Sequence, residues 1–134
     1  MKISTRGRYA LRIMVDLAEK SDGKYVPLKD IVERQGVSLK YAESVMLLLS
    51  KKSLIDAERG KGGGYKLNKP AEYYTVGEIL RATEGDLGAV ECLSFGGCER
   101  AADCRTLPLW KEFNACVNAF FDGKTLADLC RRDF

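Results

Sequence analysis

The sequence predicts a mainly α-helical fold with one small β-hairpin, in the arrangement of a winged helix-turn-helix followed by a long dimerisation helix. Three observations predict it. Apolar residues recur at helical spacing in several segments, a short glycine-containing turn separates two of these helices, and a glycine-rich stretch between two alternating runs follows them. The chain has 134 residues, 46% of them hydrophobic, which is enough for one hydrophobic core with an extension.

Three helices are predicted in the first part of the chain, at residues 4–20, 27–35 and 39–52. In each of them, apolar side chains recur at the three- and four-residue spacing that places them on one face. Gly36 can adopt the left-handed conformation that ends a helix. Ser38 is suited to cap the beginning of the next helix. The second and third helices, with the short turn between them, therefore form a helix-turn-helix.

A β-hairpin is predicted to follow directly. Apolar and polar side chains alternate over residues 54–59 and again over 65–67, and the sequence Gly-Lys-Gly-Gly-Gly lies between them. A helix-turn-helix followed by such a hairpin is the winged-helix arrangement. We therefore expect two domains, a winged helix-turn-helix DNA-binding domain at residues 1–70 and a cysteine-loop and dimerisation-helix region at 71–134.

The second region is predicted to hold three more helices. A capping-box pattern begins a helix over residues 75–83, and a similar pattern at 125–128 begins a short final one. Between them, residues 84–104 contain cysteines and glycines and are predicted as a loop, and residues 106–122 as a long helix. Four apolar side chains of this helix repeat at 3-4-3 spacing, which is typical of a coiled-coil-like seam. They are Trp110, Phe113, Val117 and Phe120.

The apolar seam predicts a homodimer. In a chain this short, a long apolar helix after the first domain more often packs against a partner than against its own core. A two-fold dimer would bind two half-sites of a palindromic operator. The alternative is that the seam belongs to the core of a monomer.

Positive charge is concentrated in the first part of the chain. Residues 1–70 hold 15 Lys and Arg against 8 Asp and Glu, whereas residues 71–134 hold 7 against 11. A basic first domain beside an acidic second one indicates that the first binds a polyanion. Together with the order of elements, this predicts double-stranded DNA as the partner. The alternative is a helical domain that serves only as a scaffold for another protein.

The candidate DNA contacts lie on the third helix and the hairpin. A recognition helix places its N-terminal residues in the major groove. There, Lys40 can pair with phosphate or guanine, and Glu43 can accept a hydrogen bond from the amino group of cytosine. At the hairpin, Arg59 beside Lys61 can enter a narrow minor groove. The residues of the helix end that face away from the apolar side are Ser38, Lys40, Glu43 and Ser44.

Three cysteines in the predicted loop are candidate metal ligands. Cys92, Cys98 and Cys104 are separated by five residues each, and the chain contains no histidine. Iron–sulfur clusters are held by cysteine thiolates, whereas zinc ligand pairs stand closer together. No C-x-x-C occurs, which disfavours a thioredoxin-like role. The alternative is that all three are ordinary free thiols. For Cys116 and Cys130, which fall in predicted helices among Ala, Val and Leu, we favour buried thiols without a metal.

Other function classes are disfavoured. No apolar run approaches the roughly 18 residues of a membrane span, and charged Arg6, Arg8 and Arg12 interrupt any signal-peptide pattern. We therefore expect a cytoplasmic protein without a membrane partner. The sequence shows no combination of nucleophile, base and orienting group, so an enzyme with a small-molecule substrate is not expected.

Several segments together resemble the IscR-type iron–sulfur cluster regulators. They are "MKISTRGRYALRIMVDLA", "VPLKDIVERQGVSLKYAE", "RGKGGGYKL" and the cysteine loop followed by "LPLW". The resemblance covers essentially the whole chain. It implies a homodimeric winged-helix transcription factor whose cluster, in a loop near the dimer helix, controls which promoters are bound. We expect a regulator that senses iron–sulfur cluster status in iron or redox homeostasis, with [2Fe–2S] favoured over [4Fe–4S].

The resemblance also implies roles for individual residues. Cys92, Cys98 and Cys104 match the three thiolate ligands, and the wing contact falls on Arg59, beside Lys61 and Gly62. The recognition-helix contacts fall on Ser38, Lys40, Tyr41, Glu43 and Ser44. The beginning of the first helix, at Thr5, Arg6 and Arg8, is implied to contact phosphates.

The fourth cluster ligand departs from the family pattern. Leu107 stands where IscR-type proteins have a histidine, and Arg8 stands where the nitric-oxide-sensing branch has an aspartate. The open alternatives are a carboxylate of the partner subunit, an external thiol, solvent, or one of Glu91, Glu99, Asp103 and Cys116. The wider family also contains cysteine-metabolism regulators without the cysteine loop, so a thiol-redox or cysteine-metabolism repressor that lacks a cluster is the alternative function.

Overall fold

Helix α1 is the element on which the other elements of the fold pack. The computed structural model describes residues 1–94 and 97–132. Helix α1 begins after Ser4, whose hydroxyl accepts a hydrogen bond from the N–H of Gly7. The elements in chain order are α1 (Thr5–Lys20), α2 (Leu28–Gln35), α3 (Leu39–Lys51), β1 (Ile55–Glu58), β2 (Gly64–Leu67), η1 (Ala71–Tyr73), α4 (Val76–Glu84), η2 (Glu91–Leu93), η3 (Ala101–Asp103), α5 (Leu107–Asp122) and α6 (Leu126–Arg131).

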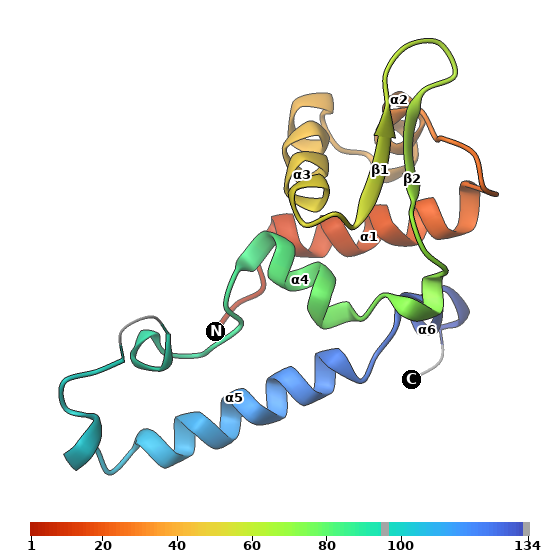
Figure 1. Ribbon diagram of the computed structural model, residues 1–134. Coiled ribbons are helices and arrows are strands. Elements are labelled where there is room, and N and C mark those ends of the chain that lie inside the picture. Colours follow the sequence, from red (N-terminus) through yellow and green to blue (C-terminus); the bar gives the residue numbers. More distant parts are fainter. Residues whose placement is uncertain (95–96, 133–134) are drawn as a thin grey trace.

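The arrangement confirms a mainly helical fold with one antiparallel hairpin. Helix α1 contacts α2, α3, β2, α4 and α6, and strands β1 and β2 pair with each other beside α3 (Figure 1). From α4 the chain runs outward through the cysteine segment and returns along α5 to α6 (Figure 1). Within the described residues, no helix is long and apolar enough to cross a membrane.

The turn of the helix-turn-helix has the predicted conformation. Gly36 ends α2 in the left-handed region, at φ 65° and ψ 37°, which glycine adopts without a steric penalty. The hydroxyl of Ser38 caps α3 by accepting a hydrogen bond from the N–H of Tyr41 at 3.1 Å. Pro27 stands one position earlier than predicted, because it is the N-cap of α2 rather than a residue of the first turn.

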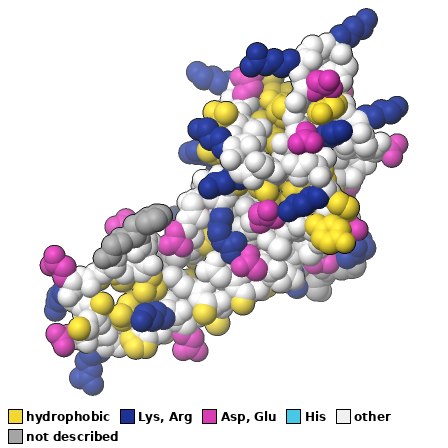
Figure 2. All heavy atoms as spheres, in the orientation of Figure 1, with side chains coloured by type: hydrophobic (Ala, Val, Ile, Leu, Met, Phe, Trp, Pro, Cys, Tyr) yellow, Lys and Arg dark blue, Asp and Glu magenta, His cyan; other side chains and the backbone are white. Residues whose placement is uncertain are grey.

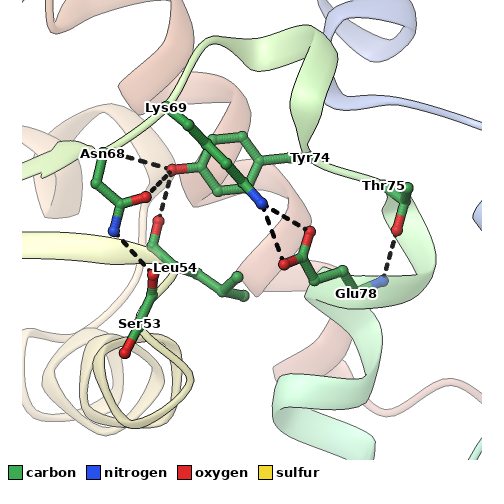
Figure 3. A network of polar contacts seen from close by, with 7 residues as sticks. All are labelled: Ser53, Leu54, Asn68, Lys69, Tyr74, Thr75 and Glu78. Atoms are coloured by element: carbon green, nitrogen blue, oxygen red, sulfur yellow. Dashed lines mark hydrogen bonds and ion pairs between the residues drawn. The ribbon is translucent and has the colours of Figure 1, made fainter.

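One of the two predicted capping boxes is complete. Before α6, the side chain of Thr125 and that of Asp128 each bind the backbone N–H of the other residue. Before α4, the hydroxyl of Thr75 accepts from the N–H of Glu78 at 3.0 Å. The carboxylate of Glu78 instead accepts hydrogen bonds from Lys69 at 3.2 and 3.3 Å (Figure 3). Helix α4 therefore starts where predicted. Its capping box is incomplete, since the carboxylate of Glu78 binds Lys69 and not the backbone N–H of Thr75.

One main core joins the N-terminal helices to the elements that follow residue 70. It takes Tyr74, Ile79 and Leu126 from the second region, which are fully buried against side chains of α1 and α3. The division at residue 70 therefore stays a prediction about function, since both regions share one core. The fully buried side chains from the first region include Ile13, Met14, Leu17, Ile31, Val45, Met46 and Leu49.

The hairpin is attached to the chain segment that precedes α2. The N–H and C=O of Val26 pair with the C=O and N–H of Tyr65, at 2.8 and 2.9 Å. Gly64 lies beside this pair with φ 145°, and a Cβ atom there would stand 2.1 Å from the carbonyl oxygen of Val26. The close approach of two backbone segments therefore requires glycine at this position.

We expect Gly64→Ala to destabilise the protein more than Gly62→Ala. At Gly62 the backbone also has positive φ, but no atom lies within 4 Å of a new Cβ, so only the conformational cost of about 1–2 kcal/mol applies. At Gly64 the clash with the Val26 carbonyl adds to it, for a total of about 3–4 kcal/mol. Urea unfolding of both variants measures the difference, and equal losses would contradict this explanation.

Candidate nucleic-acid interface and cysteine segment

The predicted DNA-contacting residues lie at three places, the N-terminal end of α3, the hairpin tip and the beginning of α1. Tyr41 is half-buried and the others are exposed. Figure 2 shows Lys and Arg side chains gathered around the end of the molecule that carries α3 and the hairpin. The exposed ones are Thr5, Arg6 and Arg8 of α1, Ser38, Lys40, Glu43 and Ser44 at α3, and Arg59, Lys61 and Gly62 at the hairpin tip.

A hollow separates α3 from the hairpin. Glu43 and Leu47 line it from α3, and Arg59, Gly60 and Gly63 line it from the hairpin. The acidic side chain that we expect to bind a base and the arginine that we expect to enter the minor groove therefore border the same concave surface. A groove with a helix on one side and a hairpin on the other has the shape that a winged helix presents to a duplex.

The cations of this surface are free to bind an external anion. In the described part of the chain, Arg6, Lys40, Arg59 and Lys61 form no ion pair with a carboxylate. The guanidinium of Arg8 donates a hydrogen bond to the hydroxyl of Thr5 at 3.1 Å, which leaves its charge uncompensated. Phosphate groups are the anions that such exposed, unpaired cations bind on DNA.

Tyr41 has a structural contact that the sequence did not indicate. Its ring packs edge-to-face against Tyr9 of α1, with ring centroids 5.7 Å apart. The guanidinium of Arg12 lies over the ring of Tyr9 at 4.8 Å and donates hydrogen bonds to the side chain and carbonyl oxygens of Gln35. This stack joins α1 to both α2 and α3. The spacing of Tyr9 and Arg12, one turn of one helix, is the signal that could have indicated it.

A buried carboxylate also holds α2 against α1, and sequence reasoning missed it. Asp16 is 5% exposed and accepts hydrogen bonds from Arg34 at 2.7 and 2.9 Å and from Gln35 at 2.9 Å. Burial by itself raises the pKa of Asp16, but the hydrogen bonds from Arg34 and Gln35 and the positive charges of Arg34 and Lys20 outweigh it and lower that pKa. The signal in the sequence that could have indicated this buried carboxylate is an acidic residue on the apolar face of a predicted helix.

The three loop cysteines differ in their local structure. Cys92 is half-buried in η2, Cys98 is exposed, and half-buried Cys104 directly follows η3. The sulfur of Cys104 lies 3.4 Å from the hydroxyl oxygen of Thr106. Hydrogen bonds from the side chain and backbone of Thr106 and from the N–H of Leu107 lower the pKa of Cys104, with the charge of Arg100 assisting.

The described geometry does not bring the candidate ligands together. In residues 1–94 and 97–132, no three Cys, Asp or Glu side chains stand close enough to hold a metal ion. The chemistry of the donors nevertheless fits a cluster, because three accessible thiols share one segment and the lowered pKa of Cys104 makes its thiolate, the form that binds iron, easier to reach. Glu91, Glu99 and Asp103 are exposed near them, and Leu107 is the first residue of α5.

Helix α5 has two apolar faces, and the predicted seam is divided between them. Val117 packs against a small cluster of its own chain, and Trp110 is half-buried. Phe113 and Phe120 are 38% and 59% exposed. Cys116, which we expected to be buried, is exposed on the same side as these two phenylalanines. The side chains on the exposed face are Leu109, Phe113, Cys116 and Phe120, at 4-3-4 spacing.

Comparison with known proteins identifies the family. The Rrf2 family, described as iron-dependent transcriptional regulators, matches residues 3–132. The chain belongs to the Rrf2 family. This Rrf2 protein is a DNA-binding transcriptional regulator and not an enzyme. Over 129 residues it is 40% identical to the HTH-type transcriptional regulator IscR of Escherichia coli, a match that covers 96% of this chain and 80% of that protein.

Solved structures of Rrf2 regulators have the same fold. The global cysteine regulator CymR of B. subtilis matches with a TM-score of 0.80 and 34% identity, over 100% of this chain and 99% of that one. IscR of T. potens matches with a TM-score of 0.76 and 32% identity, over 100% of this chain and 89% of that one. This Rrf2 chain is thus similar both to a cysteine regulator and to an IscR.

We expect Asp16→Asn to lower stability in a pH-dependent manner. Loss of the charged hydrogen bonds to Arg34 should reduce the free energy of unfolding by about 1–3 kcal/mol at pH 7. Since the folded-state pKa of Asp16 is depressed below its ordinary value of 3.8, its contribution is present above that pH and is lost as the pH falls through the folded-state pKa. Urea unfolding at a series of pH values should show the two proteins converge in acid. A constant difference would contradict this role.

Proposed function

We propose that this Rrf2 regulator senses iron–sulfur cluster status through a cluster held by Cys92, Cys98 and Cys104. The observation that carries the proposal is the group of three accessible thiols on one segment that leads directly into α5. The lowered pKa of Cys104 supports it, because the thiolate is the form that ligates iron. The likeness to IscR proteins over nearly the whole chain supports it as well.

On DNA, we propose that α3 lies in the major groove and the hairpin in the adjacent minor groove. Lys40 and Glu43 would then reach base edges, and Arg59 would enter the minor groove, where the negative potential is strongest. Lys61 at the hairpin tip would contact phosphate, as would the exposed residues at the beginning of α1. The unpaired state of these cations and the hollow between α3 and the hairpin support this placement.

We propose further that two copies of the chain bind one palindromic operator through α5. The exposed face of this helix presents Leu109, Phe113, Cys116 and Phe120, and an apolar face of this length is costly to leave in water. Its 4-3-4 spacing suits the packing of a second helix. Native mass spectrometry of the DNA complex should find two chains per duplex, and one chain per duplex would contradict the dimer.

We expect Lys61→Ala to weaken DNA binding by a similar factor on every sequence. Removal of one phosphate contact should reduce the slope of log Kd against log salt by about 0.9. The matched control is Lys111→Ala, which removes an exposed lysine of α5, away from the hairpin. The measurement is fluorescence anisotropy over a salt series on a palindromic duplex selected from a random pool with the wild-type protein. Equal slopes for Lys61→Ala and Lys111→Ala would contradict the proposed placement of the hairpin.

The cluster would supply a centre whose oxidation or loss reports the iron–sulfur supply of the cell. Two ion pairs of α4 join α5, the helix that follows the cysteine segment, to the residues after the hairpin. Arg81 of α4 pairs with Asp122 of α5 at 2.6 Å, and Glu78 of the same helix pairs with Lys69 after the hairpin at 3.2 Å. Helix α4 therefore touches both the helix behind the cysteine segment and the base of the hairpin.

The fourth ligand is open, because Leu107 stands where the resemblance to IscR-type proteins implies a histidine. Leu107 cannot ligate iron. Cys116 lies nine residues further along α5, a rise of about 14 Å, so we disfavour it as a ligand within the same chain. We propose an oxygen ligand, from one of the exposed carboxylates near the loop or from solvent, and a [2Fe–2S] cluster as the first choice.

We expect anaerobically reconstituted protein to be coloured and Cys98→Ala to lose the visible absorption. Loss of one of three thiolate ligands should abolish stable cluster binding. Cys130→Ala is the control, because half-buried Cys130 lies in α6 outside the cysteine segment, and this variant should keep the colour and the iron content. A wild-type protein that stays colourless and free of iron after reconstitution would contradict the cluster.

The alternative is a thiol-redox or cysteine-metabolism repressor that works without a cluster. Two observations favour it: the described cysteines do not converge, and the fold is that of a global cysteine regulator. In that case the protein stays colourless, and oxidation changes DNA affinity while a disulfide appears by mass spectrometry. Affinity that follows iron loading instead would remove this alternative.

A further inference from the structure

Two of the large apolar side chains that remain exposed lie on the recognition helix. Leu39 is 52% exposed and Leu47 is 56% exposed, in a helix whose Val45, Met46 and Leu49 are fully buried. Leu39 is the first residue of α3 and directly precedes Lys40. An aliphatic side chain at that position contributes nothing to the core, so its exposed surface is available to a partner.

Leu39 lies on the row of α3 that faces the proposed DNA site. Residues four apart in a helix lie above one another on one face, which places Leu39, Glu43 and Leu47 in a single row. Glu43 and Leu47 line the hollow between α3 and the hairpin, opposite Arg59. Leu39 continues this row to the N-terminal end of α3, the end that a recognition helix brings to the base edges.

We propose that Leu39 recognises thymine in the operator by packing against its C5-methyl group. The inference rests on the proposed placement of α3 in the major groove. Leucine has no donor or acceptor, and the methyl group of thymine is the apolar group that the four base pairs present in that groove. A polar base edge at this position would lose its water without gaining a hydrogen bond from leucine. The contact therefore discriminates against the other bases as well as binding thymine.

The position of this thymine follows from the helix geometry. Leu39 and Glu43 are four residues apart, a rise of about 6 Å along α3. Base pairs are stacked about 3.4 Å apart. The thymine should therefore lie within two base-pair steps of the cytosine whose amino group donates a hydrogen bond to Glu43. Each half-site should contain one such combination of thymine and cytosine.

Uracil substitution tests the contact directly, because deoxyuridine keeps every hydrogen bond of thymidine and lacks only the methyl group. Each thymine of the palindromic duplex selected with the wild-type protein is replaced in turn. At one thymine per half-site, the change should raise the Kd of the wild type about fourfold, the size expected for one buried methyl group. The same change should leave the Kd of Leu39→Ala unaltered. Leu39→Met, which restores an apolar side chain, should recover the dependence on the methyl group.

Leu47→Ala is the matched control, since it shortens an equally exposed leucine in the same row, two turns further along α3. It should keep the wild-type uracil profile. The inference is overturned if Leu39→Ala shows the same profile as the wild type, or if Leu47→Ala erases the same dependence. Urea unfolding checks that Leu39→Ala remains as stable as the wild type, as its exposure requires.

Glu43→Gln separates failure of this inference from failure of the proposed function. If Glu43→Gln relaxes the preference for cytosine while no thymine depends on Leu39, α3 lies in the groove and the inference on Leu39 alone is wrong. If Glu43→Gln leaves all base preferences unchanged, or if the pool yields no enriched sequence, the placement of α3 is wrong and the inference on Leu39 is wrong with it.

Discussion

The hydroxyl of Tyr74 is the contact on which the position of the hairpin depends. Tyr74 is fully buried, its hydroxyl donates to the carbonyl oxygen of Leu54 at 2.7 Å, and it accepts from the N–H of Asn68 at 3.0 Å (Figure 3). The side chain of Asn68 then donates to the carbonyl of Ser53 at 2.8 Å. Burial raises the pKa of Tyr74, so the phenol keeps its proton and remains a donor. Residues just before β1 and just after β2 are thereby fixed to the chain that leads into α4.

Helix α4 extends this connection to the rest of the molecule. At its C-terminal end, the carboxylate of Glu84 accepts a hydrogen bond from the N–H of Ser4, which caps α1, at 2.9 Å. On its side, Arg81 binds Asp122 and also Asn118 of α5, the latter at 3.0 Å. The residues after the hairpin and the C-terminal half of α5 are therefore both joined to one short helix by polar contacts. Because α4 also packs directly against α3, a displacement of α5 would act through α4 on α3 as well as on the residues that follow the hairpin.

Local patterns in the sequence were sufficient for most of the fold and insufficient for its contacts. Gly36 and Ser38 define the ends of two helices through their own backbone and side chain, so single residues predict them. The capping box at Thr75 is incomplete because the carboxylate of Glu78 binds Lys69, a residue outside the four-residue capping pattern. The partners of Asp16 lie on another helix and could not be derived from spacing. Likewise, the apolar residues of α5 fit two seams, and only the packing of Val117 decides which face is exposed. The cysteine segment could not be predicted in detail, because its residues show no regular apolar spacing, and under the proposed function a metal rather than the chain would gather its ligands.

The cap of α3 explains the choice of residue at its N-terminus. The hydroxyl oxygen of Ser38 accepts a hydrogen bond from the N–H of Tyr41, and because Ser38 is exposed, its own O–H remains available as a donor. Aspartate would cap the helix equally well, but under the proposed placement of α3 it would set a negative charge against DNA. Asparagine would avoid the charge with a bulkier amide. Serine is the smallest side chain that both caps the helix and keeps an uncharged O–H donor. Under the proposed placement of α3, the oxygen of this hydroxyl serves the fold as an acceptor while its proton serves DNA binding as a donor.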